Sequence, residues 1–141
     1  MQEALIKRLR ADTELAALVG SHSKRGRPMI DWGTRPNDPA LPAIVMYKVS
    51  PGVTYDQDKP TALEGPRVQF SIIGETYAAA TLVFRRLRAL LENGETVDDV
   101  VFERAFLDAE RDLNPRDIDG GGTEHLLGAD FIIWHRRAEP E

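Results

Sequence analysis

Hydrophobic residues recur at helical spacing in the first part of the chain. They are Leu5, Ile6, Leu9, Leu15, Leu18 and Val19. Apolar residues three or four positions apart lie on one face of a helix, and Gly20 is a typical C-terminal stop, so we predict helix over residues 2–19. Asp12 stands three residues before Leu15, as an N-cap would, and the pattern therefore fits one bent helix and two short helices equally well.

Two segments in the middle of the chain have the pattern of β-strands. Residues 42–49 are rich in β-branched and aromatic side chains and begin at a proline. Residues 66–74 alternate regularly, with apolar side chains at every second position from Val68 to Ile72. The connection between them, residues 50–65, contains several Pro, Gly and Asp residues and is longer than typical connections, so we predict a long functional loop there.

A second, longer helix is predicted over residues 77–92. Thr76 is a suitable N-cap, and an apolar stripe follows that ends before Asn93 and Gly94. The stripe consists of Ala80, Val83, Phe84, Leu87, Leu90 and Leu91. The opposite face carries Arg85, Arg86 and Arg88, which is typical of a helix with one side in water.

The remaining segments give weaker signals for strands. Residues 21–42 have the composition of a loop, in which only residues 29–32 could pair as a short strand. Residues 100–111 interleave apolar and charged side chains as an extended strand does, and a polar loop then continues to Glu124. Residues 126–136 are predicted as the last strand because four of them, at positions 131 to 134, are large and apolar.

The order of these elements predicts an α+β fold. We expect a two-layer sandwich, in which an antiparallel or mixed sheet of about four to five strands is covered on one face by the N-terminal helix and the second long helix. A chain of 141 residues with 42% hydrophobic content fits one domain, residues 1–141, with one core and a frayed tail at residues 137–141.

Composition limits the classes of protein. Cysteine is absent, which excludes disulfides, thiolate metal sites and cysteine nucleophiles. The net charge of −5 argues against a protein whose main task is to bind nucleic acid. No apolar stretch approaches the length of a membrane span, and the early charges Lys7 and Arg8 fall where a signal peptide would be apolar, so we expect neither a membrane segment nor export.

The spacing of the reactive side chains matches no catalytic or metal-binding motif. The histidines His22, His125 and His135 fit no triad or zinc motif. The glycines at 120–122 lack the Lys and Ser or Thr of a phosphate loop, and the acidic residues around them do not have calcium-loop spacing. We therefore predict no enzyme activity, no cofactor and no metal.

Basic residues cluster at three places, which are Lys7-Arg8-Arg10, Lys24-Arg25-Arg27 and Arg85-Arg86-Arg88. Such residues usually solvate an outer face, but the loop from Lys24 to Arg27 is the better candidate for contact with an acidic partner. Trp32 fits a subunit interface and a buried core position about equally well.

Several segments follow one another along the chain in a recognisable order. They are Leu15-Ala-Ala-Leu-Val-Gly20, Leu41-Pro-Ala-Ile-Val-Met-Tyr47, Arg67-Val-Gln-Phe-Ser-Ile-Ile-Gly74 with Thr76-Tyr-Ala-Ala-Ala80, and Gly128-Ala-Asp-Phe-Ile-Ile-Trp134. In this order they resemble the phage tail terminator, or tail completion, family of long-tailed phages, prophages and gene-transfer particles. They carry core pattern and turn placement rather than a catalytic fingerprint, and residues 21–32 are more basic than the family leads one to expect.

The resemblance implies a structural virion protein assembled in the host cytoplasm. It implies a homo-oligomer, a hexameric ring, that caps the tail tube protein, stops its growth and meets the head connector or neck protein, while DNA passes through the lumen without specific binding. The loops at 50–65 and 114–124 are then candidates for axial contacts. Their candidate interaction residues are Tyr55, Asp56, Asp58, Arg116, Asp117 and Asp119, beside Lys24, Arg25, Arg27 and Trp32.

Three other interpretations remain open from the sequence. The chain could be a head completion or portal adaptor subunit of the same particle, which would share its size and acidity. A small ligand-binding domain or enzyme would need a pocket with perturbed carboxylates. A nucleic-acid-binding module would require the three basic clusters to converge on one surface.

Overall fold

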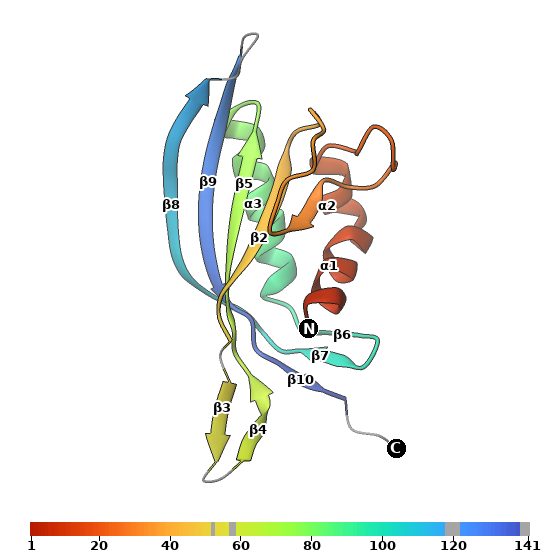
Figure 1. The fold of residues 1–141 in the computed structure, drawn as a ribbon, viewed down its shortest axis with the longest axis vertical. Helices are drawn as coiled ribbons and strands as arrows, with labels where there is room; N and C mark the ends of the chain where they lie inside the picture. The colour runs from red at the N-terminus through yellow and green to blue at the C-terminus, as the bar shows by residue number, and fades with distance from the viewer. Residues whose placement is uncertain (52, 57–58, 118–121, 139–141) are drawn as a thin grey trace.

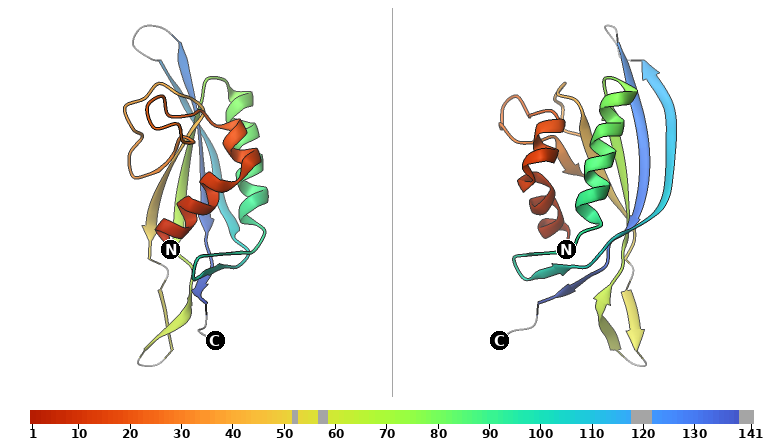
Figure 2. Two further views of the ribbon diagram at one scale, coloured as in Figure 1. Left: turned by 90° about the vertical axis from the view of Figure 1, so that its right-hand side faces the viewer. Right: turned by 180° about the vertical axis from the view of Figure 1, so that it is seen from behind.

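The computed structural model describes residues 1–51, 53–56, 59–117 and 122–138, with the backbone alone at 53–56, 59–62, 114, 116 and 117. A helical layer covers one face of a five-stranded sheet, and a second sheet lies at one end of this sandwich (Figure 1). Figure 2 shows from two further sides that the helices lie on a single face. The predicted α+β class is confirmed.

The N-terminal segment forms two short helices, α1 (Gln2–Ala11) and α2 (Thr13–Leu18). Asp12 between them has an extended backbone, and its Oδ2 accepts a hydrogen bond of 2.9 Å from the Leu15 N–H. An N-cap side chain satisfies one of the backbone donors that a helix start leaves without a partner. Asp12 therefore divides the segment, and the structure decides between the two alternatives in favour of two helices.

The main sheet has the strand order β1-β2-β5-β9-β8. Its members are β1 (Ile30–Trp32), β2 (Ala43–Ser50), β5 (Arg67–Gly74), β9 (Thr123–Ile132) and β8 (Phe106–Asp117). β1 runs parallel to β2, and every other pair is antiparallel. The strands predicted at 42–49 and 66–74 are confirmed to within one residue at each end.

Helix α3 (Tyr77–Leu91) lies against β5 and β9 of this sheet. Its predicted N-cap is confirmed, because Thr76 Oγ1 accepts a hydrogen bond of 3.1 Å from the Ala79 N–H. Val83, Leu87 and Leu91 are fully buried, as the apolar stripe predicted. They pack with the sheet residues of the core, among which Phe70 and Phe131 make an edge-to-face contact with ring centroids 5.5 Å apart.

A second sheet has the order β3-β4-β10-β7-β6. Its members are β3 (Val53–Asp56), β4 (Lys59–Glu64), β10 (His135–Arg137), β7 (Val100–Phe102) and β6 (Glu95–Val97). The prediction of one long loop over residues 50–65 is wrong, because β3 and β4 form a hairpin that projects from the body (Figure 1). The Pro, Gly and Asp residues of this segment pointed to a loop and hid the pairing of β3 with β4.

The other strand predictions also need correction. Residues 100–111 do not form one strand, since Glu103 to Ala105 separate β7 from β8, and the two belong to different sheets. The polar segment 112–117 continues β8 rather than forming a loop. It is polar because β8 is an edge strand, held by β9 alone. The last predicted strand divides into β9 and β10 at the bend of residues 133–134.

Trp134 lies at the joint between the two sheets. A Cβ atom added at Gly65 would come within 2.6 Å of the Trp134 ring, so the ring packs directly on the glycine backbone. Gly65 links β4 of one sheet to β5 of the other. The close approach therefore fixes how the chain passes from the hairpin into the main sheet.

Candidate assembly surfaces

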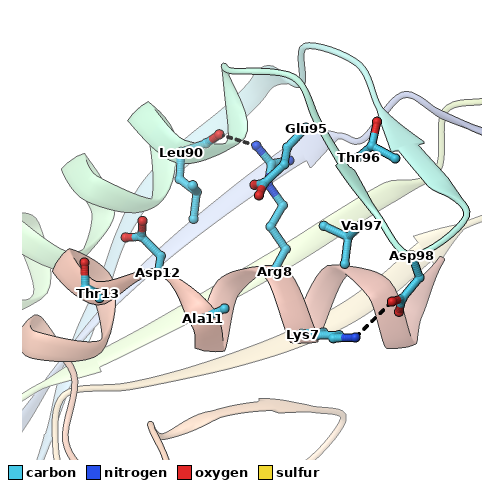
Figure 3. A pocket seen from close by; sticks show the side chains of 10 residues that line it. All are labelled: Lys7, Arg8, Ala11, Asp12, Thr13, Leu90, Glu95, Thr96, Val97 and Asp98. Carbon is cyan, nitrogen blue, oxygen red and sulfur yellow. Dashed lines mark hydrogen bonds and ion pairs between the residues drawn. The ribbon is translucent and has the colours of Figure 1, made fainter.

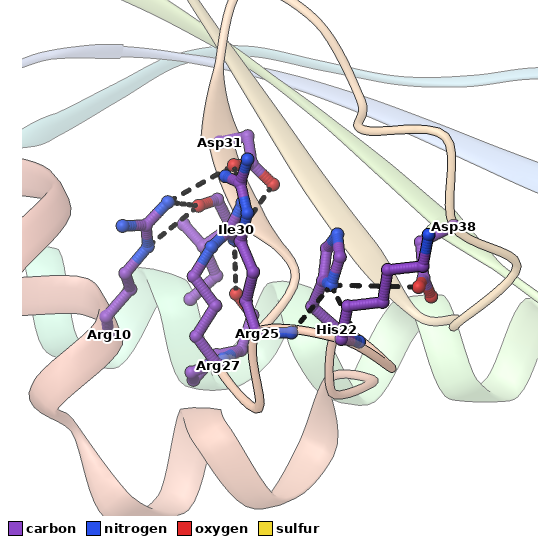
Figure 4. A network of polar contacts seen from close by, with 9 residues as sticks. Arg10, His22, Arg25, Arg27, Ile30, Asp31 and Asp38 are labelled. Carbon is purple, nitrogen blue, oxygen red and sulfur yellow. Dashed lines mark hydrogen bonds and ion pairs between the residues drawn. The ribbon is translucent and has the colours of Figure 1, made fainter.

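The predicted basic run from Lys24 to Arg27 lies in a loop of residues 21–28, here called the basic loop, which has an internally bonded structure between α2 and β1 (Figure 4). The His22 N–H donates to the Arg27 carbonyl at 2.7 Å. His22 Nδ1 accepts from the N–H groups of Lys24 and Arg25 at 3.2 and 3.1 Å. The imidazole is buried, so it closes the turn from inside and leaves the Lys24 and Arg25 side chains exposed.

A buried carboxylate, Asp38, holds this loop to the following segment. It accepts hydrogen bonds from the Ser23 hydroxyl, from the Ser23 N–H at 3.0 Å and from the Ala40 N–H at 2.9 Å. The hydrogen bond from the Ser23 side chain, followed by the two backbone donors, lowers the pKa of Asp38 to about 2. His22 Nδ1 lies 3.8 Å away. The loop is thus anchored at its base by a group that stays ionised at neutral pH.

Two arginines converge on the carboxylate of Asp31 at the edge strand β1. Arg27 donates to Asp31 Oδ1 at 2.7 Å, and Arg10 of α1 donates to the same oxygen at 3.1 Å. Arg10 also donates two hydrogen bonds to the Ile30 carbonyl, at 3.0 and 2.8 Å. Burial, followed by the nearby Arg27, lowers the pKa of Arg10. Positive charge is therefore crowded at this side of the sheet.

The three basic clusters of the sequence do not converge on one surface. Arg10 joins the loop residues, whereas Arg8 of the same cluster turns toward the end of α3, and Arg86 of the third cluster binds Asp12. Lys24 and Arg25 form no ion pair with any residue whose side chain is described. We call Arg10, Lys24, Arg25 and Arg27 the basic edge.

Trp32 lies between β1 and the beginning of α1. Its Nε1 donates to the Gln2 carbonyl at 3.0 Å, and its ring is half-buried against the core cluster. This position closes one end of the helical layer. The other candidate residues lie elsewhere: Tyr55 and Asp56 in β3, Arg116 and Asp117 at the end of β8, and Asp58 and Asp119 outside the described residues.

The opposite edge of the main sheet, β8, carries negative charge at two residues that were not among the predicted interaction residues. Glu110 and Asp112 are exposed and form no ion pair with the described part of the chain. The Tyr77 hydroxyl of α3 donates to both carboxylate oxygens of Asp112 at 3.2 Å, and this hydrogen bond raises the pKa of Tyr77. We call Glu110 and Asp112 the acidic edge. Phe106, at the start of β8, is also exposed.

The face of the main sheet away from the helices carries an arginine between two carboxylates. Arg67 of β5 donates to Asp130 of β9 at 3.0 Å and to Asp108 of β8. These hydrogen bonds, with the one to Asp130 first, raise the pKa of Arg67. Tyr47 and Val49 of β2 are exposed near the same end of the sheet. The face therefore combines a neutralised polar centre with apolar side chains at its border.

A pocket of about 450 Å³ opens between α1, the end of α3 and β6 (Figure 3). Arg8 donates to Glu95 at 2.9 Å and to the Leu90 carbonyl at 2.7 Å, while Lys7 binds Asp98 at 2.9 Å. These pairs engage the charged side chains of α1 and β6 with each other. The pocket thus lies where ion pairs hold α1 to the segment that contains β6.

Two smaller hollows, of about 300 and 210 Å³, meet at His135 of β10. Its Nε2 lies 3.9 Å from Glu64 on β4, where the hairpin joins the body. Burial lowers the pKa of His135 and favours the neutral ring. In the described part of the chain no three His, Asp or Glu side chains are grouped to hold a metal ion. No helix there is long and apolar enough to cross a membrane.

Comparison with known proteins identifies the fold. No family profile matches the sequence, and no curated protein matches it. One chain of a solved structure, described as the virion of a native gene transfer agent particle, superposes with a TM-score of 0.63. The match covers 96% of this chain and 94% of that chain at 15% sequence identity. The two chains therefore share a fold over nearly their whole lengths.

Proposed function

We propose that the chain is a structural virion protein of a phage-like particle, a tail terminator that caps the end of the tail tube as a ring. The observation that carries the proposal is the shared fold with a chain of a gene transfer agent virion, which extends over nearly the full length of both. The segments whose order resembles that of tail terminators lie in α2, β2, β5, the start of α3 and β9.

Two projecting hairpins suit a subunit that joins two other proteins. The β3–β4 hairpin leaves one end of the body, held at its base by β10, and the β8–β9 hairpin forms the opposite end (Figure 1). β5 pairs with β9 only from His125 onward, so the outermost part of β8–β9 extends past the other strands. In a ring whose axis runs along the strands, one hairpin would reach the tube and the other the connector.

The net charge is compatible with this location. DNA must traverse the lumen of such a ring, and a net acidic subunit would not retain it as a basic lining would. The basic edge then belongs away from the lumen, where it can serve contacts between proteins.

The test is the mass of the assembled species, measured by light scattering after size exclusion over a range of concentrations, with and without purified tail tube protein. A sixfold species, alone or on tube ends, is the expected result. A strict monomer that ignores tubes at every concentration would refute the proposal.

A head-side adaptor ring of the same particle is the second candidate. The shared fold suits it equally, because the name of the matched virion does not say which of its components the matched chain is. Adding purified portal protein in a parallel experiment separates the two. A ring that binds portal assemblies and leaves tube length unchanged would move the assignment to the head side.

A further inference from the structure

We propose that the basic edge of one subunit docks on the acidic edge of a second copy, so that the main sheet repeats head to tail around the ring. This inference rests on the proposed ring and names its interface. The two edges lie at opposite sides of one sheet, since β1 is one outer strand and β8 the other. A ring needs such a pair of different surfaces on each subunit, because a heterologous contact generates a cycle when its rotation closes.

The charges at the two edges are opposite in sign. At the basic edge, Asp31 is the carboxylate that Arg10 and Arg27 share, and Lys24 and Arg25 are exposed and form no ion pair with the described side chains. At the acidic edge, Asp112 receives a hydrogen bond from the Tyr77 hydroxyl and forms no ion pair within the described residues. Glu110, its neighbour on the same face of β8, also forms no ion pair there, and Arg88 of α3 interacts with it only electrostatically.

The strand register places the two edges at the same level along the strands. Ile30 of β1 pairs with Ile44, and the row continues through Ile72 and Leu127 to Asp112. The next row on this face runs from Trp32 through Met46, Phe70 and Ala129 to Glu110. Rotation about an axis parallel to the strands preserves height, so it brings the Arg10–Asp31 level of one copy to the Glu110–Asp112 level of the next.

Arg10 of the basic edge and Asp112 of the acidic edge also lie on the helical side of the sheet. The buried residues in the same rows as Asp112 point into the core beneath the helices. Asp112 lies on the same face of the sheet as these residues, and it therefore contacts Tyr77 of α3. Arg10 projects from α1 on that same side and covers the Ile30 carbonyl of β1. The two edges therefore lie at the same level along the strands and in the same layer, and their charges are opposite in sign.

The Tyr77 ring is about half exposed beside Asp112 of the acidic edge. Exposed ion pairs contribute little affinity, so burial of this ring would stabilise the contact. The charges would select the partner surface and the direction of assembly.

Charge reversal tests the contact. Arg25→Glu and Asp112→Arg, each alone, should raise the concentration for half-maximal ring assembly by roughly 10- to 100-fold, and the double variant in one chain should restore assembly. Arg85→Glu is the matched control, because Arg85 is an exposed arginine on α3 that forms no ion pair in the described structure and belongs to neither edge. Circular dichroism establishes that each variant is folded.

Crosslinking gives an independent measurement in the same assembly. The chain has no cysteine, so Arg25→Cys and Asp112→Cys introduce the only thiols. A short bis-maleimide should join the two variants when they are mixed and assembled, and should join neither variant to itself.

The outcomes separate this contact from the proposed function. Rings that form normally in both single reversals would overturn the contact and leave the terminator assignment intact. A wild-type chain that never assembles, even on tube ends, would overturn both. Normal rings whose retention on duplex DNA is lost in Arg25→Glu would overturn the contact and assign the basic edge to nucleic acid.

Discussion

Replacing Arg8 by Met should remove one of the strongest links between the helical layer and the second sheet. The Arg8 side chain is 2% exposed, and its guanidinium donates to the carbonyls of Leu90 and Asn93 at 2.7 and 2.5 Å and to Glu95 at 2.9 Å. It also lies 5.4 Å from the centroid of the Phe102 ring. Arg8 thus satisfies backbone acceptors at the C-terminus of α3, where a helix leaves its last carbonyls without partners.

The two carbonyl contacts set the size of the effect. Hydrogen bonds to charged groups contribute about 1.5–3 kcal/mol each, whereas the pair with the half-exposed Glu95 contributes at most about 1 kcal/mol. Removing the guanidinium also removes the cost of burying its charge, so we expect a net loss of about 2–4 kcal/mol. With an unfolding entropy of about 2.1 cal/mol/K per residue, this corresponds to a fall in Tm of roughly 7–13 °C.

Urea denaturation followed by circular dichroism measures the loss. Met retains the apolar stem of the arginine, so the comparison isolates the polar contacts. Glu95→Gln is the control and should cost less than about 1 kcal/mol, because it leaves both carbonyl contacts of Arg8 in place. A loss below 1 kcal/mol for Arg8→Met, or equal losses for the two variants, would show that the capping of α3 by Arg8 does not stabilise the fold.

Three further changes have defined outcomes. Gly65→Ala should cost about 1–3 kcal/mol in urea denaturation because its Cβ would meet the Trp134 ring at 2.6 Å, whereas Gly128→Ala, with no neighbour nearer than 3.6 Å, should cost less. The pKa of Asp38, about 2 against the ordinary 3.8, lies below its unfolded value, so its contribution is present above about pH 4 and is lost as pH falls toward 2. Backbone amide signals of the basic loop should therefore shift over that range in wild type and not in Asp38→Asn. Burial lowers the pKa of His135 below 6.5, so the unfolded chain takes up this proton first, and stability should fall as pH drops below 6.5. The difference in urea midpoint between pH 7.5 and 5.5 should be smaller in His135→Gln, and an equal difference would contradict this assignment.

Patterns tied to burial were predictable from the sequence. The alternation in residues 66–74 and the stripe in residues 77–92 correspond to β5 and α3, because both elements have one face in the core. β8 was only partly predicted, since an edge strand with one paired side needs no apolar face along its whole length. The β3–β4 hairpin was missed for a related reason: its strands pair with each other and with β10 at the base, so no core pattern marks them.

The basic edge was partly predictable from the sequence, and the acidic edge was not. Lys24, Arg25 and Arg27 were recognisable as a local run, and the structure adds Arg10 because α1 and β1 meet there. The acidic edge could not be recognised from composition, since Glu110 and Asp112 alternate with other residues in a strand of mixed charge. Their significance comes from a register that spans five strands, which depends on pairings far apart along the chain.

The register shifts within β8 bear on how the chain avoids aggregation. Pairing with β9 is displaced between Leu107 and Ala109 and again between Leu113 and Arg116, and Pro115 lacks a backbone donor. An incoming strand from another molecule would lose its hydrogen-bonding ladder at each irregularity, so continuous β-stacking cannot spread along this long edge. A twelve-residue strand can therefore form the border of the sheet without inviting edge-to-edge stacking.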